Sequence, residues 1–185
     1  MAATITPAVG IPTGTWALDS THSSASFAVK HMVVATFRGR FEDFDASLTA
    51  TEDGDATLTG VVQADSIVVK DENLAGHLKS PDFFDTERHP EIRFVSTAIR
   101  RDGEELVVDG DLTIKGQTQR VEARGTITDP VVTLGDAEKI GLTLEAIVDR
   151  TAYGLNWNAP LPKGGVALAN DVKLLVELEL VRAEG

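Results

Sequence analysis

The chain is predicted to be mainly β, an antiparallel sheet that closes into a barrel of about eight strands. Apolar and polar residues alternate along nearly every segment, which is typical of strands with one buried face. Short polar turns, such as 52–55 and 101–104, separate these segments. Little helical sequence exists to cover the apolar face, so the sheet must close on itself or fold into a sandwich. We expect one domain over residues 15–185, preceded by a flexible arm at 1–14.

The first half of the chain contains four predicted strand regions. The ordered part begins with a short strand in which Trp16 and Leu18 share one face, and a second strand follows over residues 24–32. Gly39 is expected to break this run, after which residues 40–51 and 56–69 form strand around a polar hairpin loop. The residues expected to face inward and to contact a bound ligand are Phe27, Val29, His31, Phe44, Ala46 and Leu48.

Residues 71–94 differ from the rest, because their pattern is not that of a strand. Asp71 is a suitable N-cap for a short helix, and Pro81 ends any helix that precedes it. This segment is expected to cap or bridge the curved sheet. The side chains expected to press onto the sheet and a ligand are Leu78, Phe83 and Phe84.

The second half repeats the alternating pattern over residues 92–99, 106–114, 118–127, 140–148 and 172–180. A long connection is expected from Asp129, and an irregular one over 153–165. The candidate ligand contacts in this half are Phe94, Leu112, Ala146, Arg150 and Trp157.

The predicted inward rows contain many small residues, including Ala46, Gly110, Ala123 and Ala146. Aromatic residues make up only 5% of the chain. A barrel of about eight strands can be filled by its side chains or can hold one small ligand. Small inward residues favour a ligand cavity, and a barrel packed solid is the alternative.

Composition restricts the partners of the protein. The formal net charge is −12, which argues against nucleic acid and against adhesion to an anionic membrane through a basic patch. There is no cysteine and no apolar run of the length that a membrane helix needs, so membrane insertion is not expected. The N-terminus lacks the pattern of a signal peptide, so we expect a cytoplasmic protein, or a periplasmic or secreted one if a leader has been removed.

No catalytic or metal motif is complete in the sequence, and no cofactor is predicted. The histidines His22, His31, His77 and His89 lack the spacing of a zinc pair. His31 shares a face with apolar residues, where it is either a core histidine or a polar contact beside a ligand head group.

Arg150 continues the inward parity of the strand that it ends. A buried arginine requires partners. An ion pair with an aspartate is the favoured interpretation, and a contact to a polar ligand head is the other.

Several stretches together resemble the YceI-like family: WALDSTHSSASF at 16–27 with His31, GRFEDF at 39–44, HLKSPDFFDTERHPEIRF at 77–94, GDLTIKGQT at 110–118, and Arg150 with Tyr153-Gly154. The resemblance implies an elongated, lipocalin-like barrel that encloses an amphiphile with a long isoprenoid or fatty tail, such as a polyprenyl compound or polyprenyl quinone. It also implies a homodimer as the expected assembly, and no catalytic residues.

The expected function is therefore to bind, sequester or carry such a lipid. Two alternatives remain from the sequence: an enzyme that modifies the lipid with His31 as acid or base, and a packed barrel with a structural or interaction role.

Overall fold

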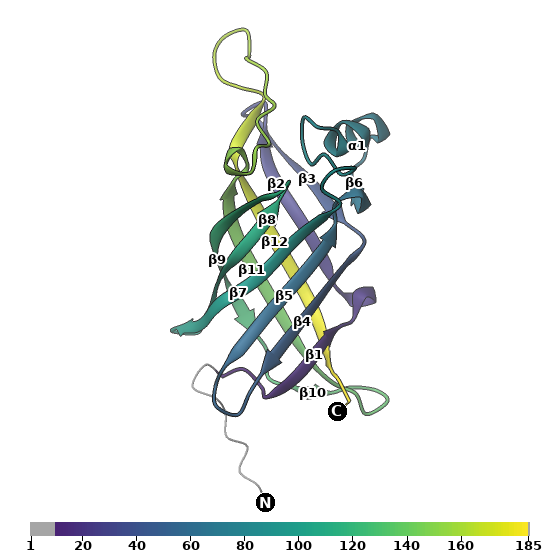
Figure 1. Cartoon of the computed structure of the whole chain (residues 1–185), viewed down its shortest axis with the longest axis vertical. Helices are drawn as coiled ribbons and strands as arrows, with labels where there is room; N and C mark the ends of the chain where they lie inside the picture. Colours follow the sequence, from purple (N-terminus) through teal and green to yellow (C-terminus); the bar gives the residue numbers. More distant parts are fainter. Residues whose placement is uncertain (1–9, 185) are drawn as a thin grey trace, which may run out of the picture.

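The computed structural model describes residues 10–184 and shows a single antiparallel sheet closed into an elongated barrel (Figure 1). The ring closes because β11 pairs with β12 as well as with β9. The predicted antiparallel barrel of about eight strands is confirmed. In order around the ring, the strands are β11 (Glu138–Asp149), β9 (Gln117–Ile127), β8 (Glu105–Ile114), β7 (Glu91–Asp102), β5 (Ala56–Gln63), β4 (Phe44–Ala50), β1 (Gly14–Leu18) and β12 (Leu168–Arg182).

The remaining strands extend this ring at its two ends. One edge of β12 pairs with β1 near the C-terminus and with β2 (Ser24–His31) further back along the strand. β3 (Ala35–Phe41) pairs with β2, and β6 (Ile67–Val68) pairs with β3. The short strand β10 (Val131–Val132) joins β11 at the opposite end of the barrel (Figure 1).

Residues 64–90 bridge the seam between the β2–β3–β6 extension and β7. The backbone N–H of Ala64 donates to the carbonyl of Pro90 at 2.8 Å, and α1 (Glu72–Lys79) follows within the bridge. Asp71 caps this helix by accepting a hydrogen bond from the N–H of Leu74 at 2.9 Å. Leu78 and Phe83 of the bridge are buried, so the predicted helix and turn segment that caps the barrel is confirmed.

The interior is packed solid at one end. Trp16 is fully buried there, and its indole N–H donates to the carbonyl of Pro12 at 2.9 Å. Burial of each large apolar side chain contributes about 1.5–3 kcal/mol to folding. The other fully buried residues of this cluster include Ile11, Leu48, Leu106, Ile140, Leu142 and Leu180. Ile11 falls within the arm predicted at 1–14; residues 1–9 of that arm lie outside the described residues.

Gly39 does not break the strand as predicted. It lies inside β3, opposite Phe27 of β2, and the turns that bound this strand lie at residues 32–34 and 42–43. A Cβ at position 39 would lie 2.5 Å from Cζ of Phe27. The glycine is therefore required by the close approach of the Phe27 ring, and the sequence pattern alone could not distinguish this role from a turn.

The predicted strand over 56–69 is likewise too long. β5 ends at Gln63, and a 3₁₀ turn over Ala64–Ser66 redirects the chain to β6. Within the long connection predicted from Asp129, the short strand β10 forms.

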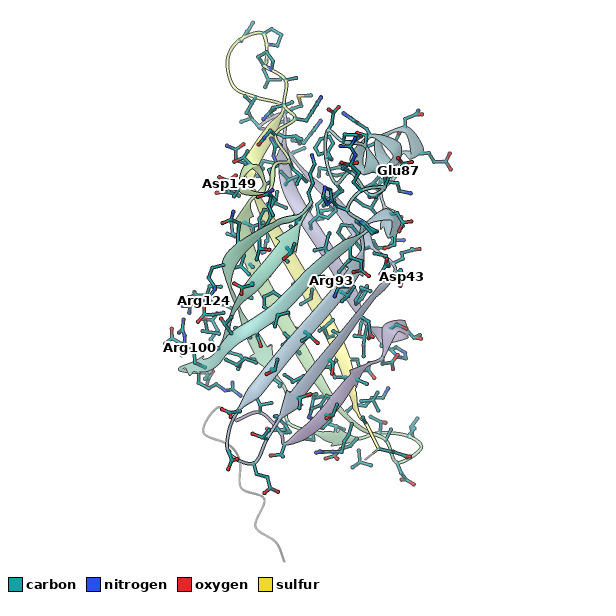
Figure 2. All side chains as sticks on the ribbon, viewed as in Figure 1. Asp43, Glu87, Arg93, Arg100, Arg124 and Asp149 are labelled. Atoms are coloured by element: carbon teal, nitrogen blue, oxygen red, sulfur yellow. The ribbon has the colours of Figure 1, made fainter. Side chains whose placement is uncertain are left out.

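Charged side chains project from the outer wall of the barrel, as Arg93, Arg100 and Arg124 show in Figure 2. Arg124 donates to Glu122, Asp102 and Glu105 at 2.7–3.1 Å. Among the described residues, no helix is long and apolar enough to cross a membrane.

Candidate functional site

The half of the barrel that carries α1 is hollow. A cavity of about 470 Å³ lies there, with walls contributed by most of the strands and by the bridge. Nearly all of its lining side chains are apolar. The large residues that fill the opposite end, such as Trp16, Ile140 and Leu180, are not in the lining. The cavity therefore has a packed floor within the barrel.

The structure brings together all but one of the residues predicted to contact a ligand. Leu48 is the exception, because it belongs to the packed end and is 1% exposed. The predicted residues that line the cavity are Phe27, Val29, His31, Phe44, Ala46, Leu78, Phe83, Phe84, Phe94, Leu112, Ala146, Arg150 and Trp157.

Small inward residues open the cavity in some places and not in others. Ala46, Ala123 and Ala146 are in the lining. At Gly110, however, the space is already taken, because a Cβ there would lie 2.4 Å from Cζ of Phe94. The ring of Phe94 thus lies across the neighbouring strand and reduces the room that the sequence pattern predicted.

The mouth of the cavity lies beside the β2–β3 turn and the 154–167 loop, where the lining residues His31, Met32 and Trp157 are exposed. Phe27 and Val29 are buried deeper along the same face of β2 as His31. His31 therefore lies on the inward-facing side of β2, as predicted, but at the exposed end of the strand rather than in the core.

An aromatic contact joins the bridge to the 154–167 loop across the mouth. The centroids of the His77 and Trp157 rings are 5.2 Å apart, and those of Phe83 and Trp157 are 5.6 Å apart. His77 also packs edge to face on Phe83, and its Nε2 lies 2.9 Å from Oδ2 of Asp82. Edge-to-face contacts of this kind are attractive, so they hold the loop against the helix.

The ion pair predicted for Arg150 is wrong. The guanidinium is buried, but its partners are backbone carbonyls: Nη1 donates to Leu155 and Trp157 at 2.6 and 2.9 Å, and Nε donates to Ala169 at 2.8 Å. Burial lowers the pKa of Arg150. The adjacent Asp149 instead accepts hydrogen bonds from the N–H and hydroxyl of Thr151. Arg150 thereby anchors the base of the 154–167 loop.

Tyr153 is a lining residue that sequence reasoning missed. It is 2% exposed, and its hydroxyl has no hydrogen-bond partner among the described residues. Burial raises the pKa of Tyr153 to about 12. The available signal was its identity as the chain's single tyrosine, three residues after the inward-facing Arg150.

A cluster of Asp19, His22 and Glu179 lies on the outer wall, away from the cavity lining. Lys139 occupies its centre, with Nζ at 2.9 Å from Asp19 and 2.6 Å from Glu179. The two carboxylates thus share one ammonium group, so the cluster has the chemistry of an ion-pair network rather than of a metal site.

A closed antiparallel barrel with an apolar cavity at one end defines the class of lipocalin-like barrels. Within that class, the chain belongs to the YceI-like family, because a family model described as the YceI-like domain matches residues 16–180. A UPF0312 protein of Staphylococcus aureus strain USA300 is 35% identical over 172 residues, covering 90% of this chain and 96% of the relative.

Three solved structures share the fold. BcnA of Burkholderia cenocepacia aligns with a TM-score of 0.73 at 22% identity, covering 88% of this chain and 98% of its own. The YCEI protein of Campylobacter jejuni aligns with a TM-score of 0.71 at 22% identity, covering 90% and 97%. A polyisoprenoid-binding domain from Saccharophagus degradans aligns with a TM-score of 0.63 at 14% identity, covering 91% and 98%.

Proposed function

We propose that this protein binds and carries an amphiphilic lipid with a long isoprenoid or fatty tail, such as a polyprenyl compound or a polyprenyl quinone. The observation that carries the proposal is the apolar cavity of about 470 Å³ within a barrel whose other end is packed. A tail in this cavity would gain about 0.8 kcal/mol for each buried CH₂ group. Because the wall offers few polar contacts, it would select only weakly for tail length and shape, and several lipids would fit.

The polar end of the ligand is proposed to lie near Tyr153. The buried hydroxyl of Tyr153 has no partner among the described residues, and a buried donor without an acceptor is destabilising. Arg150 is less available, since backbone carbonyls already accept from its guanidinium. A carbonyl or hydroxyl group on the head of the lipid would satisfy Tyr153 without bringing a second charge into the cavity.

Binding is favoured over catalysis. His31, the residue that an enzymatic alternative would need, is exposed at the mouth, and no hydrogen bond within the described residues orients its ring. The solved domain from Saccharophagus degradans that shares this fold is a polyisoprenoid-binding domain, which supports the class of tail proposed.

The proposal is tested by native mass spectrometry of the purified protein, followed by organic extraction and mass analysis of what is released. A discrete extra mass that matches a polyprenyl or fatty amphiphile is the expected result. Ala46→Trp and Ala146→Trp place an indole in the cavity and should abolish uptake, whereas Ala98→Trp on the exposed face of β7 should not. Uptake that is unchanged in both cavity variants would rule out the cavity as the binding site.

A further inference from the structure

A set of exposed apolar side chains surrounds the mouth of the cavity. We define the apolar rim as Met32, Val33, Val34, Trp157 and Val166, which are 36–85% exposed. They come from two segments that lie side by side, since the N–H of Met32 donates to the carbonyl of Ala167 at 2.7 Å. Val33 also lies close to Gly165, where a Cβ would be 3.7 Å from its Cγ2. The two segments therefore present these exposed side chains together at the point where a lipid would enter.

The turn at residues 32–34, which carries three of the rim side chains, has backbone conformations that its residues rarely adopt. Met32 and Val33 have φ angles of 51° and 66°. This left-handed region suits glycine and asparagine, and a β-branched residue there is a genuine outlier. Local folding would favour a polar turn residue at position 33, so the exposed valine is not explained by the hairpin itself.

The two rim segments also differ from the rest of the chain in charge. Asp and Glu make up 29 of the 185 residues, yet residues 30–41 and 150–170 contain neither. Lys30 and Lys163 flank the rim in sequence and are exposed, and no ion pair joins either of them to another described residue. The net charge of the whole molecule is −12, which argues against adhesion to an anionic membrane. These two segments contain basic residues and no acidic ones, so their own charge does not oppose such adhesion.

The opposite end of the barrel provides a contrast. Val131, Val132 and Leu134 are exposed there too, but they lie between Asp129 and Asp136 in the sequence and outside the cavity lining. Within residues 10–184, exposed apolar residues lie beside both basic residues and the cavity only at the mouth. There the 154–167 loop extends along the long axis of the barrel (Figure 1).

We propose that the apolar rim docks on the surface of a phospholipid bilayer, so that the lipid passes between membrane and cavity by direct contact rather than through water. This inference rests on the proposed function. Apolar side chains would enter the interfacial layer, and Lys30 and Lys163 would face the headgroup phosphates. Carboxylates, which phosphates repel, are absent from both segments that would make this contact.

A matched pair of double variants tests the proposal. V33N/V34D removes two valines of the rim that are 68% and 85% exposed, and V131N/V132D makes the same changes at the far end, where the valines are 59% and 67% exposed. Asparagine suits the left-handed conformation at position 33, so V33N/V34D is expected to fold at least as stably as the parent protein.

The measurement is the rate at which a pyrene-labelled fatty acid moves to the protein from vesicles of phosphatidylcholine with a minor fraction of phosphatidylglycerol. For the parent protein and V131N/V132D, the rate should rise with vesicle concentration, as transfer by contact requires. For V33N/V34D, transfer should be about tenfold slower and independent of vesicle concentration. Equal rates for the two variants, or a parent rate that does not depend on vesicle concentration, would overturn the proposal.

Two controls separate the other outcomes. V33N/V34D should bind the same probe with unchanged affinity when it is dispersed in buffer from ethanol, which shows that its cavity is intact. Failure of the parent protein to bind the dispersed probe would overturn the proposed function, and the docking proposal with it. If light scattering shows that the parent protein is a dimer and that V33N/V34D is a monomer, the rim is an interface between copies and membrane docking is wrong.

Discussion

The indole of Trp157 meets the imidazole of His77 edge to face, with ring centroids 5.2 Å apart. This contact joins the 154–167 loop to α1 across the mouth of the cavity. The two rings come from segments that lie about eighty residues apart in the sequence, so the mouth closes only when the tertiary structure is complete.

Trp157→Ala should accelerate ligand release. It removes the ring contacts with both His77 and Phe83, and each aromatic pair contributes about 0.5–1.5 kcal/mol. We expect dissociation of a bound lipid to be about tenfold faster in stopped-flow displacement. Trp157→Phe keeps an aromatic ring at the mouth and should stay close to the parent rate. A release rate unchanged in Trp157→Ala would show that the aromatic contact does not gate the cavity.

Tyr153 can be titrated directly, because it is the chain's single tyrosine. Burial raises the pKa of Tyr153 to about 12, whereas an unfolded tyrosine ionises near its ordinary value of about 10. The stabilisation linked to this group is fully present below about pH 10 and is lost as pH rises through the folded pKa. Tyrosinate absorbance should therefore appear near pH 12 in the folded protein and near pH 10 in urea. Ionisation of the folded protein at the ordinary pH would contradict the burial of the hydroxyl.

Tyr153→Phe should make the ligand-free protein more stable. The substitution keeps the ring and removes a hydroxyl that has no partner among the described residues, which should raise the free energy of unfolding by about 1 kcal/mol. Chemical denaturation of delipidated protein provides the measurement. The same variant should bind a polyprenyl quinone about fivefold more weakly if the hydroxyl bonds to the head group. A less stable variant would indicate that the hydroxyl already has a partner.

His22 should titrate above its ordinary range. A hydrogen bond with Asp19 raises the pKa of His22, so the stability linked to this histidine is present below its unfolded pKa and is lost as pH rises through the folded value. Nuclear magnetic resonance titration of the His22 ring in the parent protein and in Asp19→Asn provides the comparison. The pKa of His22 should fall toward the ordinary value in the variant, and an unchanged pKa would contradict the role of Asp19.

Strand periodicity predicted an antiparallel sheet that closes on itself or folds into a sandwich, and the YceI-like resemblance predicted the elongated barrel. The alternation of apolar and polar residues identified the inward rows, and Asp71 and Pro81 located α1 between them. The ends of the strands were harder to predict where a glycine could be interpreted in two ways. Gly39 reads as a turn in the sequence, but its role is to accommodate the ring of Phe27 from the neighbouring strand.

The candidate site was harder to predict wherever it depended on how the chain closes in space. Parity placed Leu48 on the inner face correctly, but parity cannot tell the packed end from the hollow end. Arg150 was assigned an aspartate partner, since no pattern reveals that a distant loop would offer its carbonyls. The apolar rim was not predicted, because the net charge describes the whole chain and does not reveal a local region without acidic residues.

The packed floor beneath the cavity has a consequence for how such a chain can change. Truncating a large side chain in the packed end, such as Leu106 or Ile140, opens a void and costs about 2–5 kcal/mol. A lining residue such as Val172 or Leu174 already faces open space, so its replacement adds less void and threatens folding less. Mutations that reshape the cavity can therefore accumulate while the packed end of the barrel stays unchanged. A barrel of this kind can therefore evolve to bind new ligands through mutations in its hollow half alone.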